Sequence, residues 1–136
     1  MSSALIPEGP VVGIGVDLVD VARFGTSIAR TPGLVSRVFT DREVAACGTG
    51  PGRVASLAAR WAAKEAVAKV LVDSSGLSWH HCEVLSGHRR QPELHLSGSV
   101  EAAAARLGIG SWLVSLSHDG GMAIAFVVAR AARGSG

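Results

Sequence analysis

The order of the secondary-structure patterns predicts an α+β fold, in which an antiparallel sheet packs against one long helix and several shorter helices. The patterns run strand, helices, hairpin, helix, hairpin, and not as repeated strand–helix–strand units. A chain of 136 residues has the size of one domain. We therefore expect a single domain over 1–136, with flexible termini at 1–10 and 131–136. The 48% of apolar residues excludes an intrinsically disordered protein.

Hydrophobic periodicity and local helix and turn signals predict each element in turn. In chain order, we expect a strand at 11–16, helices at 20–30, 40–47 and 54–73, strands at 82–85 and 93–96, a helix at 99–107, and strands at 112–117 and 122–129. Thr40 and Glu43 form a capping-box pattern, which is typical of a helix start. Asp119, Gly120 and Gly121 predict the turn of the last hairpin.

Composition and charge exclude several classes of function. The longest clear apolar run, residues 122–129, is too short to span a membrane, and the first ten residues show no signal-peptide pattern. A net charge of +2 and an aromatic content of 4%, without tyrosine, do not favour a nucleic-acid partner. Cys47 and Cys82 form no CxxC pair, which argues against a zinc site and for free thiols in the cytoplasm.

Positive charge is concentrated in residues 21–60. This segment contains six arginines, no lysine and two acidic residues, so its net charge is +4. Guanidinium groups bind carboxylates and phosphates through two parallel hydrogen bonds, so the segment suits an acidic or phosphorylated partner. The structural alternative is a solvated helix surface without a partner.

The helix predicted at 54–73 carries three charged residues where apolar ones are expected. Lys64 lies in the middle of an apolar stripe, and Glu65 and Lys69 lie on its flank, one turn apart. A buried charge is costly unless it is paired or binds a metal, so these residues are candidates for a functional site. The structural alternative is an ion pair between Glu65 and Lys69, with Lys64 extending along the surface to water.

Two predicted strands end in polar residues that suit catalysis. Residues 13–17 (GIGVD) place Asp17 at one strand end, and residues 114–119 (VSLSHD) place His118 and Asp119 at another. Structural roles are also open, because Asp17 or Asp20 could cap the following helix and Asp119 could shape the turn. Adjacent strand residues point to opposite faces, so His118 and Asp119 share a face only if the strand breaks there.

The combination of these segments, in this order and spacing, resembles the holo-acyl-carrier-protein synthase family of 4′-phosphopantetheinyl transferases over about residues 11–130. The segment RWAAKEA at 60–66, followed by Lys69, is the most specific part of the resemblance. The other matching segments are GIGVD at 13–17 followed by Arg23, FTDRE at 39–43, the stretch with Arg90 and Pro92, and VSLSHD at 114–119. The turn at 88–92 (HRRQP) departs from the family pattern, which has a tight turn of glycine, a basic residue and proline.

The resemblance implies Mg²⁺-dependent transfer of the 4′-phosphopantetheine group from coenzyme A to a serine of an apo acyl carrier protein, with release of adenosine 3′,5′-bisphosphate. It also implies a role for each matching residue. By this resemblance, Asp17 and Glu65 bind the metal; Glu65, Lys69, His118 and Asp119 are catalytic; Arg60, Lys64, Lys69, Arg90, Pro92 and His118 bind coenzyme A; and Arg23 and Arg30 bind the carrier protein. The base that accepts the serine proton stays open between Glu65, Asp119 and a water molecule.

The resemblance further implies a homotrimer with active sites at the subunit interfaces, and an acidic acyl carrier protein as the partner of the arginine-rich segment. Carriers of fatty acid and of polyketide synthesis fit equally well. Two other classes of function stay open. A non-catalytic phosphate- or nucleotide-binding module would use the arginines but not the carboxylate pair. An oligomerisation module would explain the alanine-rich helix but not the charges along it.

Overall fold

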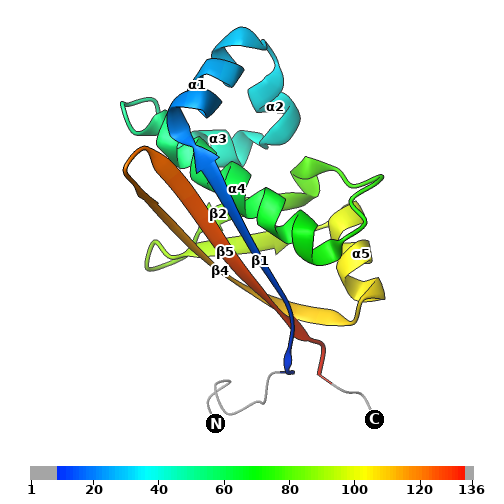
Figure 1. The fold of residues 1–136 in the computed structure, drawn as a ribbon. Helices are drawn as coiled ribbons and strands as arrows, with labels where there is room; N and C mark the ends of the chain where they lie inside the picture. Colours follow the sequence, from blue (N-terminus) through cyan, green and yellow to red (C-terminus); the bar gives the residue numbers. More distant parts are fainter. Residues whose placement is uncertain (1–8, 134–136) are drawn as a thin grey trace.

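The computed structural model describes residues 9–133 and confirms the α+β class (Figure 1). Its elements are β1 (Val11–Asp20), α1 (Val21–Arg30), α2 (Leu34–Val38), α3 (Asp41–Cys47), α4 (Arg53–Leu71), the 3₁₀ helix η2 (Trp79–His81), β2 (Cys82–Ser86), β3 (Pro92–Leu96), α5 (Gly98–Arg106), β4 (Ile109–Asp119) and β5 (Met122–Ala131). Each predicted element has a counterpart. The helices α2 and η2 are additional to the prediction, because five and three residues are too few to show a helical period.

The strands form two antiparallel sheets. β5 lies between β1 and β4 in a three-stranded sheet, and β2 pairs with β3 in a two-stranded sheet. Both predicted hairpins are therefore present. In the three-stranded sheet, Asp17 of β1 lies opposite Ala125 of β5, and Ala125 lies opposite Leu116 of β4. β1 and β4 are thus the two edges of this sheet.

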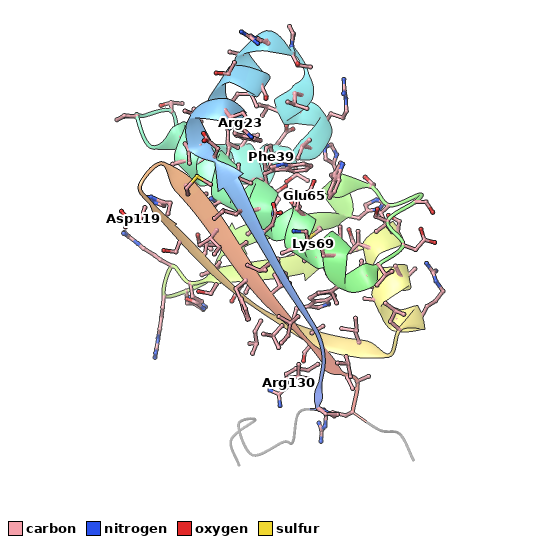
Figure 2. All side chains as sticks on the ribbon, in the orientation of Figure 1. Arg23, Phe39, Glu65, Lys69, Asp119 and Arg130 are labelled. Atoms are coloured by element: carbon pink, nitrogen blue, oxygen red, sulfur yellow. The ribbon has the colours of Figure 1, made fainter. Side chains whose placement is uncertain are left out.

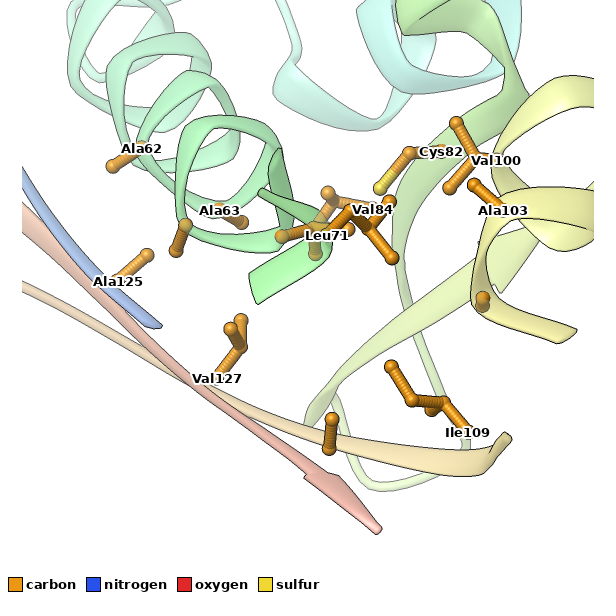
Figure 3. Packing of buried hydrophobic residues seen from close by; sticks show 14 residues of the cluster. Ala62, Ala63, Leu71, Cys82, Val84, Val100, Ala103, Ile109, Ala125 and Val127 are labelled. Atoms are coloured by element: carbon orange, nitrogen blue, oxygen red, sulfur yellow. The ribbon is translucent and has the colours of Figure 1, made fainter. Parts of the chain in front are cut away.

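The long helix α4 covers one face of the three-stranded sheet (Figure 1). Small residues make this packing close: Ala62, Ala63 and Ala66 are fully buried, and Ala62 and Ala63 lie near Ala125 of β5 (Figure 3). Gly15 of β1 is needed for this approach, because a side chain there would collide with the backbone of Ala66. The close packing brings the middle of β1, residues 13–17, alongside the second half of α4.

The remaining core has two parts. Val84 of β2, Val100 of α5 and Ile109 of β4 pack together with the far end of α4 (Figure 3). Phe39 and Leu57 form a second cluster that joins α1, α2 and α3 to the start of α4. This second cluster places the short helices beside the end of β1, where α1 forms one wall of a groove.

Hydrogen bonds join the described residues of the two terminal ranges, 1–10 and 131–136, that the sequence predicts to be flexible. Gly9 accepts a hydrogen bond from Arg130 Nε, and the backbone N–H of Ala131 donates to Pro10. The rest of that prediction falls on residues 1–8 and 134–136, which lie outside the described residues. No helix in the part of the chain from 9 to 133 is long and apolar enough to cross a membrane.

Candidate active site

One flank of α4 brings three of the predicted site residues together beside β1. Asp17 was predicted to end this strand, but β1 continues through Asp20, so Asp17 lies within it. Lys69 Nζ donates hydrogen bonds of 2.9 Å to the Asp17 carboxylate and 2.9 Å to the carbonyl oxygen of Val16. Glu65 lies one helical turn before Lys69 on the same flank (Figure 2). Asp17 faces the helix because strand residues alternate, and its neighbours Val16 and Leu18 point outward and are exposed.

The electrostatics of this flank fit a site for a divalent cation. Partial burial, and after it repulsion from the Asp17 carboxylate, raises the pKa of Glu65, while the Lys69 ammonium opposes the rise. The Asp17 carboxylate is therefore close enough to Glu65 to disfavour the negative charge of Glu65. A Mg²⁺ ion would relieve this repulsion, since it binds one or two carboxylates and completes its octahedron with phosphate oxygens and water.

A groove extends from this flank towards α1. Its lining includes Asp17, Asp20, Arg23, Trp61 and Glu65. Asp20 is the N-cap of α1 and accepts a hydrogen bond from the backbone of Arg23, so the strand end and the helix start are joined rigidly. The guanidinium of Arg23 is thus placed in the same groove as the carboxylate pair. The predicted carrier-binding residue Arg30 is exposed at the other end of α1.

The opposite flank of α4 holds predicted coenzyme-binding residues. Arg60 and His118 line one pocket between α4 and β4. Arg60 is mostly buried, with its Nε donating to the carbonyl oxygen of Val84 and one terminal nitrogen donating to Ser56 Oγ at 2.6 Å. These bonds brace β2 against α4 and leave the guanidinium at the pocket wall.

The turn between β2 and β3 lies on the same side of the molecule. Pro92, at the start of β3, lines a groove with Trp112 of β4. Arg90 is exposed in the turn and has a left-handed backbone conformation with φ 63°. Residues other than glycine rarely adopt this conformation. Arg90 adopts it in the same turn whose sequence departs from the family's glycine-containing pattern.

The predicted site residues therefore form two groups within one chain. Asp17, Glu65 and Lys69 lie at the β1 edge, whereas Arg60 and His118 lie at the β4 edge. β5 separates the two edges, and two strand spacings amount to about 10 Å of backbone. The resemblance implies active sites at subunit interfaces, but the sequence does not indicate which residues come from which subunit.

Lys64 does not have the role that was predicted for it. Its side chain is buried, and its Nζ donates to Glu43 Oε1 at 2.8 Å, to the carbonyl oxygen of Trp79 at 2.8 Å and to that of Cys82. An ammonium group has three donors, so none is left for a coenzyme phosphate. The structural alternative fails as well, because Lys64 does not extend to water and Lys69 pairs with Asp17 rather than with Glu65.

Glu43 is a residue whose importance the sequence showed only in part. The predicted capping box with Thr40 is present. In addition, the fully buried carboxylate of Glu43 accepts hydrogen bonds from Lys64 and from the backbone N–H of Val84, so it joins α3, α4 and β2. A lysine at the centre of an apolar stripe was the signal that a buried carboxylate partner had to exist.

Asp119 lies away from the carboxylate pair. β4 continues unbroken through Asp119, so His118 faces α4 and Asp119 faces the other side of the sheet. The Asp119 carboxylate accepts a hydrogen bond from the backbone N–H of Gly120 at 3.0 Å, and Figure 2 shows it at the hairpin turn, apart from Glu65 and Lys69. Within one chain, Asp119 therefore lies at the turn and apart from the predicted catalytic residues Glu65 and Lys69.

The fold and these residues belong to a known class of enzyme. The profile of the 4′-phosphopantetheinyl transferase superfamily matches residues 13–127. The chain belongs to this superfamily and is a transferase of the phosphopantetheinyl class. The family resemblance found in the sequence is thereby confirmed.

The relatives of the chain within this superfamily have a more specific name. A holo-[acyl-carrier-protein] synthase from Frankia casuarinae is 57% identical over 119 residues, which cover 88% of this chain and 97% of that protein. One from Streptomyces coelicolor is 48% identical over 119 residues, with the same two coverages. A solved complex of such a synthase with coenzyme A, from Chronobacterium ammoniagenes, is similar in structure with a TM-score of 0.77 at 31% identity, covering 89% of this chain and 98% of that one.

Proposed function

We propose that the protein is a Mg²⁺-dependent holo-[acyl-carrier-protein] synthase, which transfers 4′-phosphopantetheine from coenzyme A to a serine of an apo acyl carrier protein. The observation that carries the proposal is the arrangement of Asp17, Glu65 and Lys69 on one flank of α4. The names of the relatives and the coenzyme A complex of a similar structure support this substrate pair. We place the reaction in the cytoplasm, where free thiols such as Cys47 and Cys82 persist.

The chemistry needs alignment and charge neutralisation more than covalent catalysis by the protein. Asp17 and Glu65 would hold Mg²⁺, which when bound neutralises charge on the diphosphate of coenzyme A. The serine oxygen forms a bond to the phosphorus that carries pantetheine, and adenosine 3′,5′-bisphosphate leaves with the electrons of the broken P–O bond. Glu65 accepts the serine proton, directly or through a water molecule, because its carboxylate lies beside the proposed metal, where the diphosphate would bind.

A second copy of the chain completes the site in this proposal. The β4 edge of one copy, with Arg60 and His118, lies against the β1 edge of the next, which carries Asp17 and Glu65. Such a head-to-tail contact closes into a ring, in agreement with the expected homotrimer. The outer face of the three-stranded sheet supports the assembly, since it exposes an apolar patch formed by Ile14, Val16, Leu18, Leu113, Ile124 and Phe126.

The acyl carrier protein docks on α1. This helix has no buried residue, and it carries the exposed side chains of Arg23 and Arg30 at its two ends. An acidic carrier would be attracted to these arginines, with an affinity that falls as salt rises. Arg23→Glu should therefore raise the KM for the carrier far more than the KM for coenzyme A. A rise confined to coenzyme A would assign Arg23 to the nucleotide instead.

The direct test is to incubate the protein with coenzyme A, Mg²⁺ and an apo carrier, and to measure the mass of the carrier. We expect one added phosphopantetheine, and no addition in EDTA. Asp17→Asn should lose most of the activity, whereas the matched control Asp73→Asn, in an exposed loop away from the site, should keep it. Binding of coenzyme A without transfer would instead support a non-catalytic module.

The shared site has its own test. Asp17→Asn and His118→Ala each damage a different edge, so co-expression of the two variants should restore activity in those sites that combine two intact edges. Light scattering should give the mass of three chains. A monomer at micromolar concentration, or no recovery in the mixed sample, would contradict the assembly.

A further inference from the structure

The contact between Lys69 and Asp17 places an ammonium on the carboxylate that the proposed metal would bind. Lys69 Nζ lies 2.9 Å from Asp17 Oδ1, with the Lys69 side chain 54% exposed and that of Asp17 17% exposed. Glu65, the other carboxylate of the proposed site, lies one helical turn before Lys69 on the same flank of α4. One ammonium group thus acts on both proposed metal ligands.

Two cations compete for this carboxylate. An ammonium in hydrogen-bond contact with Asp17 repels a divalent ion bound to the same carboxylate, and the repulsion is strong in a partly buried site. A metal ion therefore binds Asp17 well only when Lys69 has moved away. The side chain is free to do so, because its other contact is a single backbone carbonyl, that of Val16, and about half of its surface faces solvent.

When the metal displaces Lys69 from Asp17, the ammonium needs another negatively charged partner, and that anion must bind together with the metal. The diphosphate of coenzyme A has this charge, and it approaches the same flank of α4 if the proposed function holds. We propose that Lys69 is an exchangeable counter-ion, which neutralises Asp17 in the empty enzyme and transfers to the diphosphate when metal and coenzyme bind together. This inference rests on the metal assignment of the proposed function.

The consequence is positive coupling between the two ligands. Metal binding alone has to displace Lys69 without compensation, whereas metal binding with coenzyme A gives the ammonium a new partner. Coenzyme A therefore tightens metal binding, and by linkage the metal tightens coenzyme A binding by the same factor. The neighbouring Lys64 could not act in this way, because all three of its donors are held by buried acceptors.

The test measures the binding of Mn²⁺ by the loss of its free-ion resonance signal, using the full-length protein without carrier. The wild type should bind Mn²⁺ weakly alone and at least about tenfold more tightly with coenzyme A. Lys69→Met should bind Mn²⁺ alone about tenfold more tightly than the wild type, and coenzyme A should then add much less. Lys69→Gln serves as a second variant if Lys69→Met is poorly folded.

Two controls separate the possible failures. Arg106→Met removes one positive charge from an exposed site at the end of α5, so an equal tightening there would reduce the effect to net charge and overturn the exchange. Asp17→Asn should abolish Mn²⁺ binding with or without coenzyme A. If Asp17→Asn binds like the wild type, the metal assignment of the proposed function is wrong. If only Asp17→Asn behaves as expected and Lys69→Met binds no more tightly, the assignment stands and the exchange is rejected.

Discussion

Two ion pairs on α4 have almost the same length and very different surroundings. Lys64 contacts Glu43 at 2.8 Å, with both side chains 0% exposed. Lys69 contacts Asp17 at 2.9 Å, with exposures of 54% and 17%. The buried pair uses all three donors of Lys64. The exposed pair, Lys69 and Asp17, is accessible to solvent and so to further ligands.

Burial, rather than distance, therefore distinguishes the structural pair from the pair of the proposed site. Breaking a buried pair leaves one charge without water or a partner, so the pair is indispensable even where its net contribution to stability is small. An exposed pair contributes about 0–1 kcal/mol and can be exchanged for another partner at little cost. Substitutions in the two pairs should therefore differ in their effect on stability.

Lys64→Met should destabilise the protein by about 3–5 kcal/mol, because the buried negative charge of Glu43 would lose its positively charged partner. Lys69→Met is the matched control, and it should change the free energy of unfolding by less than about 1 kcal/mol. Urea denaturation of both variants measures the contrast. Adding Glu43→Gln to Lys64→Met should recover part of the loss. Equal destabilisation by the two lysine variants would show that burial does not distinguish the pairs.

Glu65→Gln should lower turnover by about 100-fold or more, since it removes the proposed base and a metal ligand. The native fold raises the pKa of Glu65 above its ordinary value of 4.5. The carboxyl group therefore ionises more readily in the unfolded chain, and the metal-free wild type loses stability as the pH rises from about 4.5 through the native pKa. The variant lacks this loss.

Melting temperatures in EDTA between pH 5 and 8 test the second part of this prediction. The difference between Glu65→Gln and the wild type should grow in favour of the variant as the pH rises, until Glu65 is fully ionised in the native state. Asp73→Asn is a control on an exposed carboxylate, whose pKa is lowered by hydrogen bonds from Ser75, so this variant should instead be less stable than the wild type at neutral pH. A constant difference across the range for Glu65→Gln would contradict the direction of the shift.

The same contrast explains what could be predicted from the sequence. Helical periodicity located Lys64 and Lys69 on the long helix and identified their positions as unusual. It could not predict their partners, because Glu43 is 21 residues from Lys64 and Asp17 is 52 residues from Lys69. Periodicity reports local geometry, whereas these pairings depend on how α3 and β1 pack against the helix.

The two edges of the sheet show the same limit. The strands were predicted well, because alternation and turn residues are local signals. That β5 lies between β1 and β4 depends on pairing over more than a hundred residues, as between Asp17 and Ala125. The separation of His118 from Asp17 follows from this order, and only the structure makes it visible.

Cys82 tests whether the buried pair is as inaccessible as its contacts indicate. Its backbone carbonyl accepts a hydrogen bond from Lys64, and burial raises the pKa of its thiol to about 12. Iodoacetamide at pH 8 should therefore modify the half-buried Cys47 first, with Cys82 at least about tenfold slower, as measured by peptide mass spectrometry. The Lys64→Met variant should lose this protection. Similar rates at the two cysteines of the wild type would show that this side of α4 opens readily.

The smallest effect is expected at Asp119, which belongs to neither flank of α4. Its carboxylate accepts a hydrogen bond from Gly120 and faces away from the helix, so Asp119→Asn should keep turnover within about twofold. Asp119→Ala should remove the turn hydrogen bond and lower stability by about 0.5–1.5 kcal/mol. His118, which faces α4 beside Arg60, should behave differently, and His118→Ala should raise the KM for coenzyme A. A loss of turnover of about 100-fold in Asp119→Asn, with coenzyme A binding retained, is the size expected for a general base. It would mean that the second copy of the chain brings Asp119 into the site. Asp119, rather than Glu65, would then accept the serine proton.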